Sequence, residues 1–203
     1  MPAAAASASP PDTALLLIDL QRDFCPGGAL AVPGGDLVIP VANRLLLAAP
    51  PAQPLYATRD WHPADSDHFQ PSGEWPRHCV ANSDGARFHP KLALPPYAQI
   101  VSKGAEPSSD GYSAFEGTLS DGTALEQDLR ARGVSHLMVG GLATDYCVRH
   151  SVLDALARGW AVTVVTDAIA PVDLRAGDGD RALQEMKTAG ATLRPCHELL
   201  SRP

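Results

Sequence analysis

The chain has 203 residues, a formal net charge of −7 and no cluster of lysine and arginine. This length suits one domain with a full hydrophobic core, and the acidic balance argues against nucleic acid or an anionic membrane surface as a partner. No apolar run reaches the ~20 residues of a membrane-spanning helix. The Ala/Ser/Pro-rich start lacks the basic and bulky apolar regions of a secretory signal. We expect a disordered tail over residues 1–11 and a single domain over 12–203.

The cysteines are scattered and form no Cys-x-x-Cys pair; they are Cys25, Cys79, Cys147 and Cys196. Without a secretory signal, free thiols are favoured over a disulfide framework. This predicts a cytoplasmic protein whose cysteines are available for chemistry. The sequence leaves open whether the chain forms a homo-oligomer.

Short apolar runs alternate along the chain with amphipathic segments. The predicted strands cover residues 13–19, 54–58, 99–102, 136–139, 160–166 and 192–193. The predicted helices cover residues 36–47, with Asp36 as the cap, and 124–131, 148–157 and 177–189. Continuous apolar strands are covered on both faces, and the alternation predicts right-handed crossovers. We therefore predict an α/β fold with three layers, α/β/α, around a mainly parallel sheet of about six strands.

Four chemically active side chains stand at or just past the carboxyl ends of predicted strands. They are Asp19, Asp60, Lys103 and Cys147. Ligands bind beyond the carboxyl ends of the strands in folds of this kind. One acid at a strand end would mean little, but four such residues predict a shared site.

Cys147 lies in the stretch 140–148, where a predicted strand leads into the first turn of the helix 148–157. Thr144 or Asp145 can cap this helix through a side-chain oxygen, and the helix N-terminus favours negative charge. The pKa of a thiol so placed is expected to fall from ~8.5 toward neutrality, which gives a nucleophilic thiolate. The alternative is a buried structural cysteine.

A cysteine that hydrolyses an amide needs a proton carrier and oxyanion donors. Asp19 can carry the proton if partial burial raises its pKa from ~3.9; the alternative is a loop-capping aspartate. Lys103 can hold the thiolate and Asp19 in place; the alternative is an exposed lysine. The backbone N–H groups at the turn into the Cys147 helix are the candidate oxyanion donors.

The long loop 59–96 gathers a carboxylate and three imidazoles: Asp60, His62, His68 and His78. This donor set suits one first-row divalent metal ion with positions open to a ligand. Zinc is favoured, and iron or manganese also fits. The alternative is a surface loop that happens to be rich in histidine. Cys79 adjoins His78 but is the weaker ligand candidate beside these harder donors.

These motifs together resemble the nicotinamidase/pyrazinamidase family of isochorismatase-like cysteine hydrolases. The resemblance spans about residues 15–170. It rests on IDLQRDFC (18–25), AVPGG (31–35), TRDWHP (58–63), HF (68–69), WPRHC (75–79), KG (103–104), YSAF (112–115) and GGLATDYCV (140–148).

The resemblance implies an amidohydrolase of NAD salvage that converts nicotinamide, and pyrazinamide as well, to the acid and ammonia through a thioester. It implies Cys147 as the nucleophile, Asp19 as the proton carrier and Lys103 as the third catalytic residue. It also implies a cis peptide bond before Ala143, with the N–H groups of Ala143 and Cys147 as oxyanion donors.

The resemblance further implies that the metal ion binds the pyridine nitrogen of the substrate. The implied substrate-binding residues are Phe24, Leu30, Trp75, Tyr112 and Ala143. Two rival functions stay open: another isochorismatase-type or small-amide cysteine hydrolase, and a non-catalytic metal- or ligand-binding relative. The histidine loop argues against the first rival, and the intact set of Asp19, Lys103 and Cys147 argues against the second.

Overall fold

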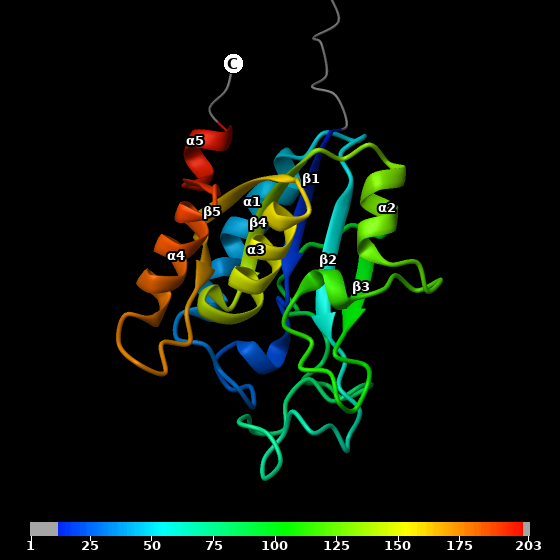
Figure 1. Ribbon diagram of the computed structural model, residues 1–203, viewed down its shortest axis with the longest axis vertical. Helices are drawn as coiled ribbons and strands as arrows, with labels where there is room; N and C mark the ends of the chain where they lie inside the picture. Colours follow the sequence, from blue (N-terminus) through cyan, green and yellow to red (C-terminus); the bar gives the residue numbers. More distant parts are fainter. Residues whose placement is uncertain (1–11, 201–203) are drawn as a thin grey trace, which may run out of the picture.

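The computed structural model describes residues 12–200, so the tail expected over residues 1–11 lies outside the described part. One six-stranded sheet has the order β3-β2-β1-β4-β5-β6, and every neighbouring pair is parallel (Figure 1). The strands are β1 (Thr13–Ile18), β2 (Leu55–Asp60), β3 (Gln99–Lys103), β4 (His136–Leu142), β5 (Ala161–Ala170) and β6 (Thr192–Arg194). The predicted α/β fold with a parallel central sheet is confirmed.

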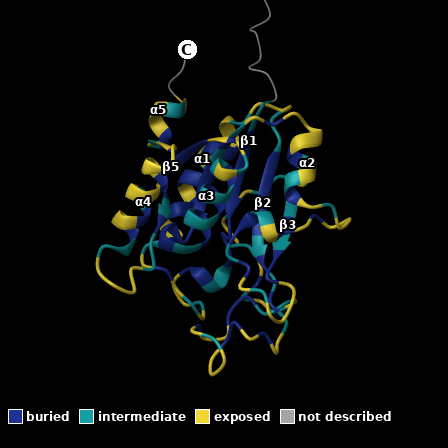
Figure 2. Ribbon diagram, in the orientation of Figure 1, coloured by how far each residue is buried: buried dark blue, intermediate teal, exposed yellow. Residues whose placement is uncertain are grey.

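Helices cover both faces of this sheet. They are α1 (Val38–Ala48), α2 (Leu125–Ala131), α3 (Arg149–Ala157), α4 (Asp178–Thr188) and α5 (Cys196–Leu200). One hydrophobic cluster contains buried residues of α2, α3 and α4, and the other contains those of α1 and α5. Side chains of β1 alternate between them: Leu16 and Ile18 join the first cluster, and Leu15 and Leu17 join the second. Figure 2 shows the buried sheet between helices whose outer faces are exposed.

The strand β4 runs three residues beyond its predicted end and includes both glycines of the Cys147 motif. Gly141 has a φ of +126°, and a Cβ there would lie 2.0 Å from the Ile18 carbonyl oxygen. Only glycine combines this backbone conformation with such close approach to β1. The two glycines therefore extend the strand and deliver the chain to the edge where the functional residues gather.

The predicted cap of α1 is wrong. Asp36 lies in a short 3-10 turn, Gly35–Leu37, and no side chain caps α1. The turn runs directly into the helix, and the Val38 N–H already donates to the carbonyls of Gly35 and Asp36. A side-chain acceptor is not needed where the backbone of a preceding turn satisfies the first helical N–H groups.

The carboxyl ends of the strands point to one edge of the sheet, where the long loops between β2 and β3 and between β3 and α2 gather (Figure 1). The four residues predicted to converge lie at this edge because the strands that precede them are parallel; they are Asp19, Asp60, Lys103 and Cys147. Among residues 12–200, the structure has no helix with the length and apolarity needed to span a bilayer.

Candidate active site and metal centre

Cys147 lies just past the end of β4, in the first turn of the following helix, as the sequence predicts. The turn is a single π-helical turn, Thr144–Val148, that leads into α3. The Ala143 carbonyl accepts the N–H groups of Tyr146 and Val148, each at 3.1 Å. The peptide bond between Leu142 and Ala143 is cis. The Cys147 side chain is buried, and all four cysteines are free thiols, as expected.

Neither predicted cap of this helix is made. No side chain caps the turn, and the Thr144 hydroxyl is buried without a hydrogen-bond partner. The Asp145 carboxylate instead accepts the backbone N–H groups of Val172 at 2.9 Å and Asp173 at 2.8 Å. Asp145 therefore ties the loop after β5 to the turn that carries Cys147.

Lys103 lies at the centre of a buried polar cluster. Its Nζ is 2.7 Å from Asp19 Oδ2 and 3.5 Å from Cys147 Sγ. It also donates to the Gly111 carbonyl at 2.7 Å and to Asp60 Oδ1. Lys103 is 1 % exposed and Asp19 is 0 % exposed. The structure therefore brings the three candidate catalytic side chains together away from solvent.

Burial and charge act in opposite directions on this cluster. Burial raises the pKa of Asp19 to about 6, although Lys103 counteracts part of this effect. Burial also disfavours the Lys103 cation, but Asp19 and Asp60 outweigh it and hold the lysine pKa well above its usual value. At neutral pH the cluster thus holds an ammonium beside a carboxylate that is poised to take up a proton.

The expectation of a lowered cysteine pKa is wrong for the free protein. Burial raises the pKa of Cys147 well above its usual value, Lys103 opposes this, and the charges of Asp19 and Asp60 add to it. The helix N-terminus does not offset the loss of solvent and the two nearby carboxylates. Cys147 therefore rests as a thiol, and an adjacent base has to remove its proton.

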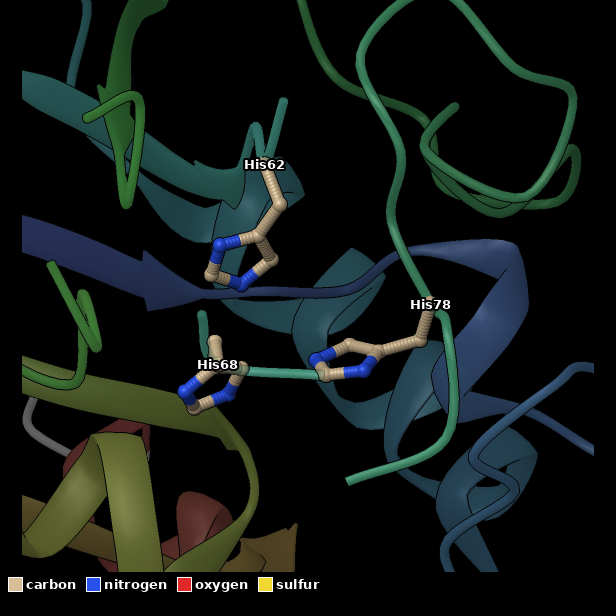
Figure 3. Close-up of side chains that lie close together, drawn as sticks. All are labelled: His62, His68 and His78. Atoms are coloured by element: carbon tan, nitrogen blue, oxygen red, sulfur yellow. The ribbon is translucent and has the colours of Figure 1, made fainter. Parts of the chain in front are cut away.

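The three loop histidines converge on a shared space (Figure 3). The ring of His62 lies 4.8 Å from that of His68 and 5.2 Å from that of His78, measured between centroids. One nitrogen from each of the three rings lies within 4.8 Å of the others. All three side chains are buried. They belong to a loop without regular strands, so only tertiary structure brings them together.

The hydrogen bonds of these rings fit a metal ion. His68 Nδ1 lies 3.0 Å from Asp110 Oδ1, and His78 Nδ1 lies 2.8 Å from the Pro76 carbonyl oxygen. These partners occupy Nδ1 and leave Nε2 as the free donor to a metal. Both ring nitrogens of His62 are buried without a hydrogen-bond partner, and a bound metal ion would give one of them a partner. Burial lowers the pKa of His78 to about 4, so this ring is neutral, as metal binding requires.

Asp60 lies beside this group at the end of β2. Its Oδ2 lies 3.7 Å from His62 Nε2 and 4.0 Å from His78 Nε2. Burial opposes its ionisation, but Lys103 and the histidines outweigh this and hold the Asp60 pKa well below its usual range. An ionised carboxylate and three imidazoles form a donor set that suits zinc, iron or manganese.

A cavity joins the cysteine to the histidine group. Its lining residues are Phe24, Leu30, Asp60, His68, Trp75, His78, Tyr112, Ala143, Tyr146, Cys147 and Val172. All five residues predicted to bind substrate are among them. Their side chains are mostly apolar or aromatic, which suits a flat ring, while the polar groups lie at the cysteine and histidine ends.

Some supporting residues were missed by reading the sequence. Gln21 is fully buried; its Oε1 accepts the Asp60 N–H at 2.8 Å, and its Nε2 donates to the Asp60 carbonyl at 2.9 Å. Thr58 Oγ1 donates to Asp19 Oδ1 at 2.6 Å. Thr58 shares a strand face with Asp60 because the two residues are two positions apart in β2, and this spacing could have indicated it. The contact of Asp110 with His68 has no such signal.

Comparison with known proteins agrees with this geometry. The family model described as the isochorismatase domain matches residues 13–197. The nicotinamidase of Escherichia coli is 44 % identical, over 90 % of this chain and 94 % of its own length. The nicotinamidase/pyrazinamidase of Mycobacterium tuberculosis is 41 % identical, over 89 % of this chain and 97 % of its own length.

A solved structure is similar as well. The pyrazinamidase of Pyrococcus horikoshii in complex with zinc matches with a TM-score of 0.81 and 42 % identity, over 91 % of this chain and 99 % of that one. These matches extend over nearly the whole fold and are not confined to the cysteine motif. The chain therefore belongs to the isochorismatase family, and within it to the nicotinamidase/pyrazinamidase group.

Proposed function

We propose that this protein hydrolyses nicotinamide to nicotinate and ammonia, with Cys147 as the nucleophile. One observation carries the proposal: a single cavity is lined by Cys147, by aromatic walls that include Phe24 and Trp75, and by His68 and His78 of the histidine group. A flat pyridine ring with an amide on one side and a nitrogen on the other matches this arrangement. Pyrazinamide has the same pattern and is a second expected substrate.

Acylation begins at the sulfur. Asp19 takes the proton of the Cys147 thiol, and the thiolate attacks the carboxamide carbon while the carbonyl electrons move to oxygen. The N–H groups of Ala143 and Cys147 donate to this oxyanion; one such donor is typically worth about 3–4 kcal/mol. Asp19 returns the proton to the amine nitrogen, the C–N bond breaks, and ammonia leaves a thioester behind.

Deacylation reverses the use of the base. Asp19 takes a proton from water, the hydroxide attacks the thioester carbon, and the C–S bond breaks to release nicotinic acid and the thiolate. The thiolate takes the proton back from Asp19, and the acid loses its own proton to solvent to give nicotinate. The Lys103 ammonium, 3.5 Å from the sulfur and 2.7 Å from Asp19, stabilises both anions through the cycle. Its place between them supports a role in holding the proton carrier and the nucleophile in register.

Asp60, His62, His68 and His78 would hold one divalent metal ion, with zinc as the first choice. When bound, the ion supplies a Lewis acid for the ring nitrogen of the substrate. The ring nitrogens of His62, which are buried without a hydrogen-bond partner, support this assignment, and the zinc complex of the Pyrococcus horikoshii relative supports the choice of metal. The four free thiols support a reducing, cytoplasmic location.

Ammonia release from nicotinamide, measured before and after chelation and after return of zinc, tests this function. We expect turnover that chelation removes and zinc restores. Turnover untouched by complete metal removal would point to another small-amide cysteine hydrolase. No turnover by the metal-loaded protein, together with binding of nicotinamide, would point to a non-catalytic relative.

A further inference from the structure

Two tyrosines stand between the substrate cavity and a second, open groove. The groove lies beside α3 and α4, and charged side chains such as Arg149, Asp178 and Glu185 line it. Tyr112 and Tyr146 line the cavity and the groove alike. Their rings therefore form a partition, with the reacting sulfur on one side and a solvent-filled surface on the other.

The partition is fixed by aromatic contacts. The rings of Tyr112 and Tyr146 lie 5.7 Å apart between centroids. Trp75 meets Tyr146 edge to face at 4.9 Å, and its Nε1 donates to the Tyr112 hydroxyl at 2.8 Å. On the groove side, His150 stacks on Tyr112 at 5.1 Å. Aromatic pairs in this range contribute about 0.5–1.5 kcal/mol each beyond their burial, so the rings hold one arrangement.

Tyr146 also has a fixed place relative to the nucleophile. It directly precedes Cys147 in the π-helical turn, and its N–H donates to the Ala143 carbonyl at 3.1 Å. The groove beyond it is polar, and two of its arginines are paired: Arg149 binds Glu185 at 2.6 Å, and Arg181 binds Asp178 at 2.5 Å. The groove therefore leaves open space behind the Tyr146 ring, on the side away from the substrate cavity.

We propose that Tyr146, supported by Tyr112, determines the size of the substrate. This inference rests on the proposed function, and it goes further by assigning the limit on ring substituents to one side chain. We expect the cavity to hold a single unsubstituted ring. A ring carbon that points at the partition cannot carry a larger group, because the group would overlap the Tyr146 ring. Without that ring, the cavity continues into the groove and the group reaches solvent.

The test compares the wild type with Tyr146→Ala on a panel of nicotinamides that carry a methyl or a phenyl group at each free ring carbon. The readout is kcat/KM for each derivative divided by kcat/KM for nicotinamide. We expect this ratio to rise by about tenfold or more for at least one derivative, the order of magnitude that a pocket wall contributes to discrimination. Ratios within about twofold of the wild type for the whole panel would overturn the proposal.

Three further variants make the result specific. Tyr146→Phe keeps the ring and is expected to keep the wild-type ratios. Tyr97→Ala removes a tyrosine that is 57 % exposed and lines neither cavity, and it should also keep them. Tyr146→Leu removes the ring but keeps an apolar side chain. It takes the place of Tyr146→Ala if the alanine variant does not fold, and it should show the same rise in the ratios. A rise in the ratios with Tyr146→Phe or Tyr97→Ala would also contradict the partition.

Dissociation constants of the same nicotinamide derivatives, measured by calorimetry, distinguish a failure of the proposed function from a failure of the Tyr146 partition. If the metal-loaded wild type fails to hydrolyse nicotinamide, the proposed function is wrong, and the ratios of dissociation constants still test the partition. If the wild type hydrolyses nicotinamide and Tyr146→Ala gains neither binding nor turnover of any derivative, the function stands and the partition is wrong.

Discussion

Asp60 and Lys103 face each other at the last positions of β2 and β3, and the lysine ammonium binds Asp60 Oδ1. The other oxygen of the same carboxylate lies 3.7 Å from His62 Nε2. One side chain therefore contacts both the cation beside Cys147 and the histidine group. The register of two neighbouring strands thus joins the candidate catalytic cluster to the candidate metal centre.

Lys103→Ala should destabilise the fold as well as stop turnover. The substitution leaves Asp19 and Asp60 buried without their cation, and removal of one partner from a buried ion pair typically costs about 3–5 kcal/mol. Urea unfolding measures this loss. Lys91→Ala, at an exposed loop position, is the matched control and should change the free energy of unfolding by less than about 0.5 kcal/mol. Equal losses for the two variants would show that the buried cluster needs no cation.

His62→Ala should lose the metal ion and raise KM sharply. Its two buried ring nitrogens have no hydrogen-bond partner in the protein, so we expect the ring to serve the metal centre rather than a hydrogen-bond network. Metal content per chain, measured by plasma mass spectrometry, checks this. His136→Ala is the control because His136 Nε2 already pairs with Thr163 Oγ1 at 2.9 Å; it should retain metal. A His62→Ala protein with full metal content and an unchanged KM is the contrary result.

Gly104→Ala should weaken metal binding through His62. A Cβ at Gly104 would lie 2.5 Å from His62 Cε1, and the residue has a φ of +65°. Mutation of a residue that positions a metal ligand typically lowers metal affinity by about 10–100-fold. Gly122→Ala is the matched control, since Gly122 has a φ of +86° and no atom within 4 Å of its Cβ position.

Both glycine variants carry the strain of a left-handed backbone, and Gly104→Ala adds the close contact with His62, so Gly104→Ala should lose more stability. Only Gly104→Ala should release metal more readily in competition with a chelator. Equal metal affinities for the two variants would mean that the contact with His62 is unimportant.

Turnover should fall in acid because of Asp19. Its pKa is raised to about 6, and only the ionised form can take the thiol proton. Below that value, kcat/KM for nicotinamide should drop by about tenfold per pH unit, and above it the acid limb should level off. Metal content measured at each pH excludes loss of the ion as the cause. A profile that stays flat through this range at constant metal content would rule out Asp19 as the base.

The sequence predicted the order of strands and helices well because buried parallel strands leave continuous apolar runs. It also predicted which side chains converge, because parallel strands bring their carboxyl ends to one edge. The histidine loop was harder in principle. His62, His68 and His78 were grouped by composition and resemblance, whereas their shared space depends on tertiary contacts with residues such as Asp110.

The pKa of Cys147 could not be predicted from the local sequence pattern. The helix N-terminus suggested a lowered pKa for Cys147, but the strand order surrounds the thiol with two carboxylates and removes solvent. The predicted cap by Asp145 is wrong for a related reason. The Asp145 carboxylate accepts N–H groups of the loop after β5, and the first of these, at Val172, lies 27 residues away in the sequence. Such contacts follow from the fold and leave no periodic signal.

The central claim is that Cys147 forms a thioester with the amide carbon of nicotinamide. Ammonia and nicotinate release by Cys147→Ala, measured beside the wild type with metal content determined on the same samples, tests it most directly. We predict that the variant keeps its metal ion and loses turnover entirely. Turnover at the wild-type rate by Cys147→Ala would contradict the claim.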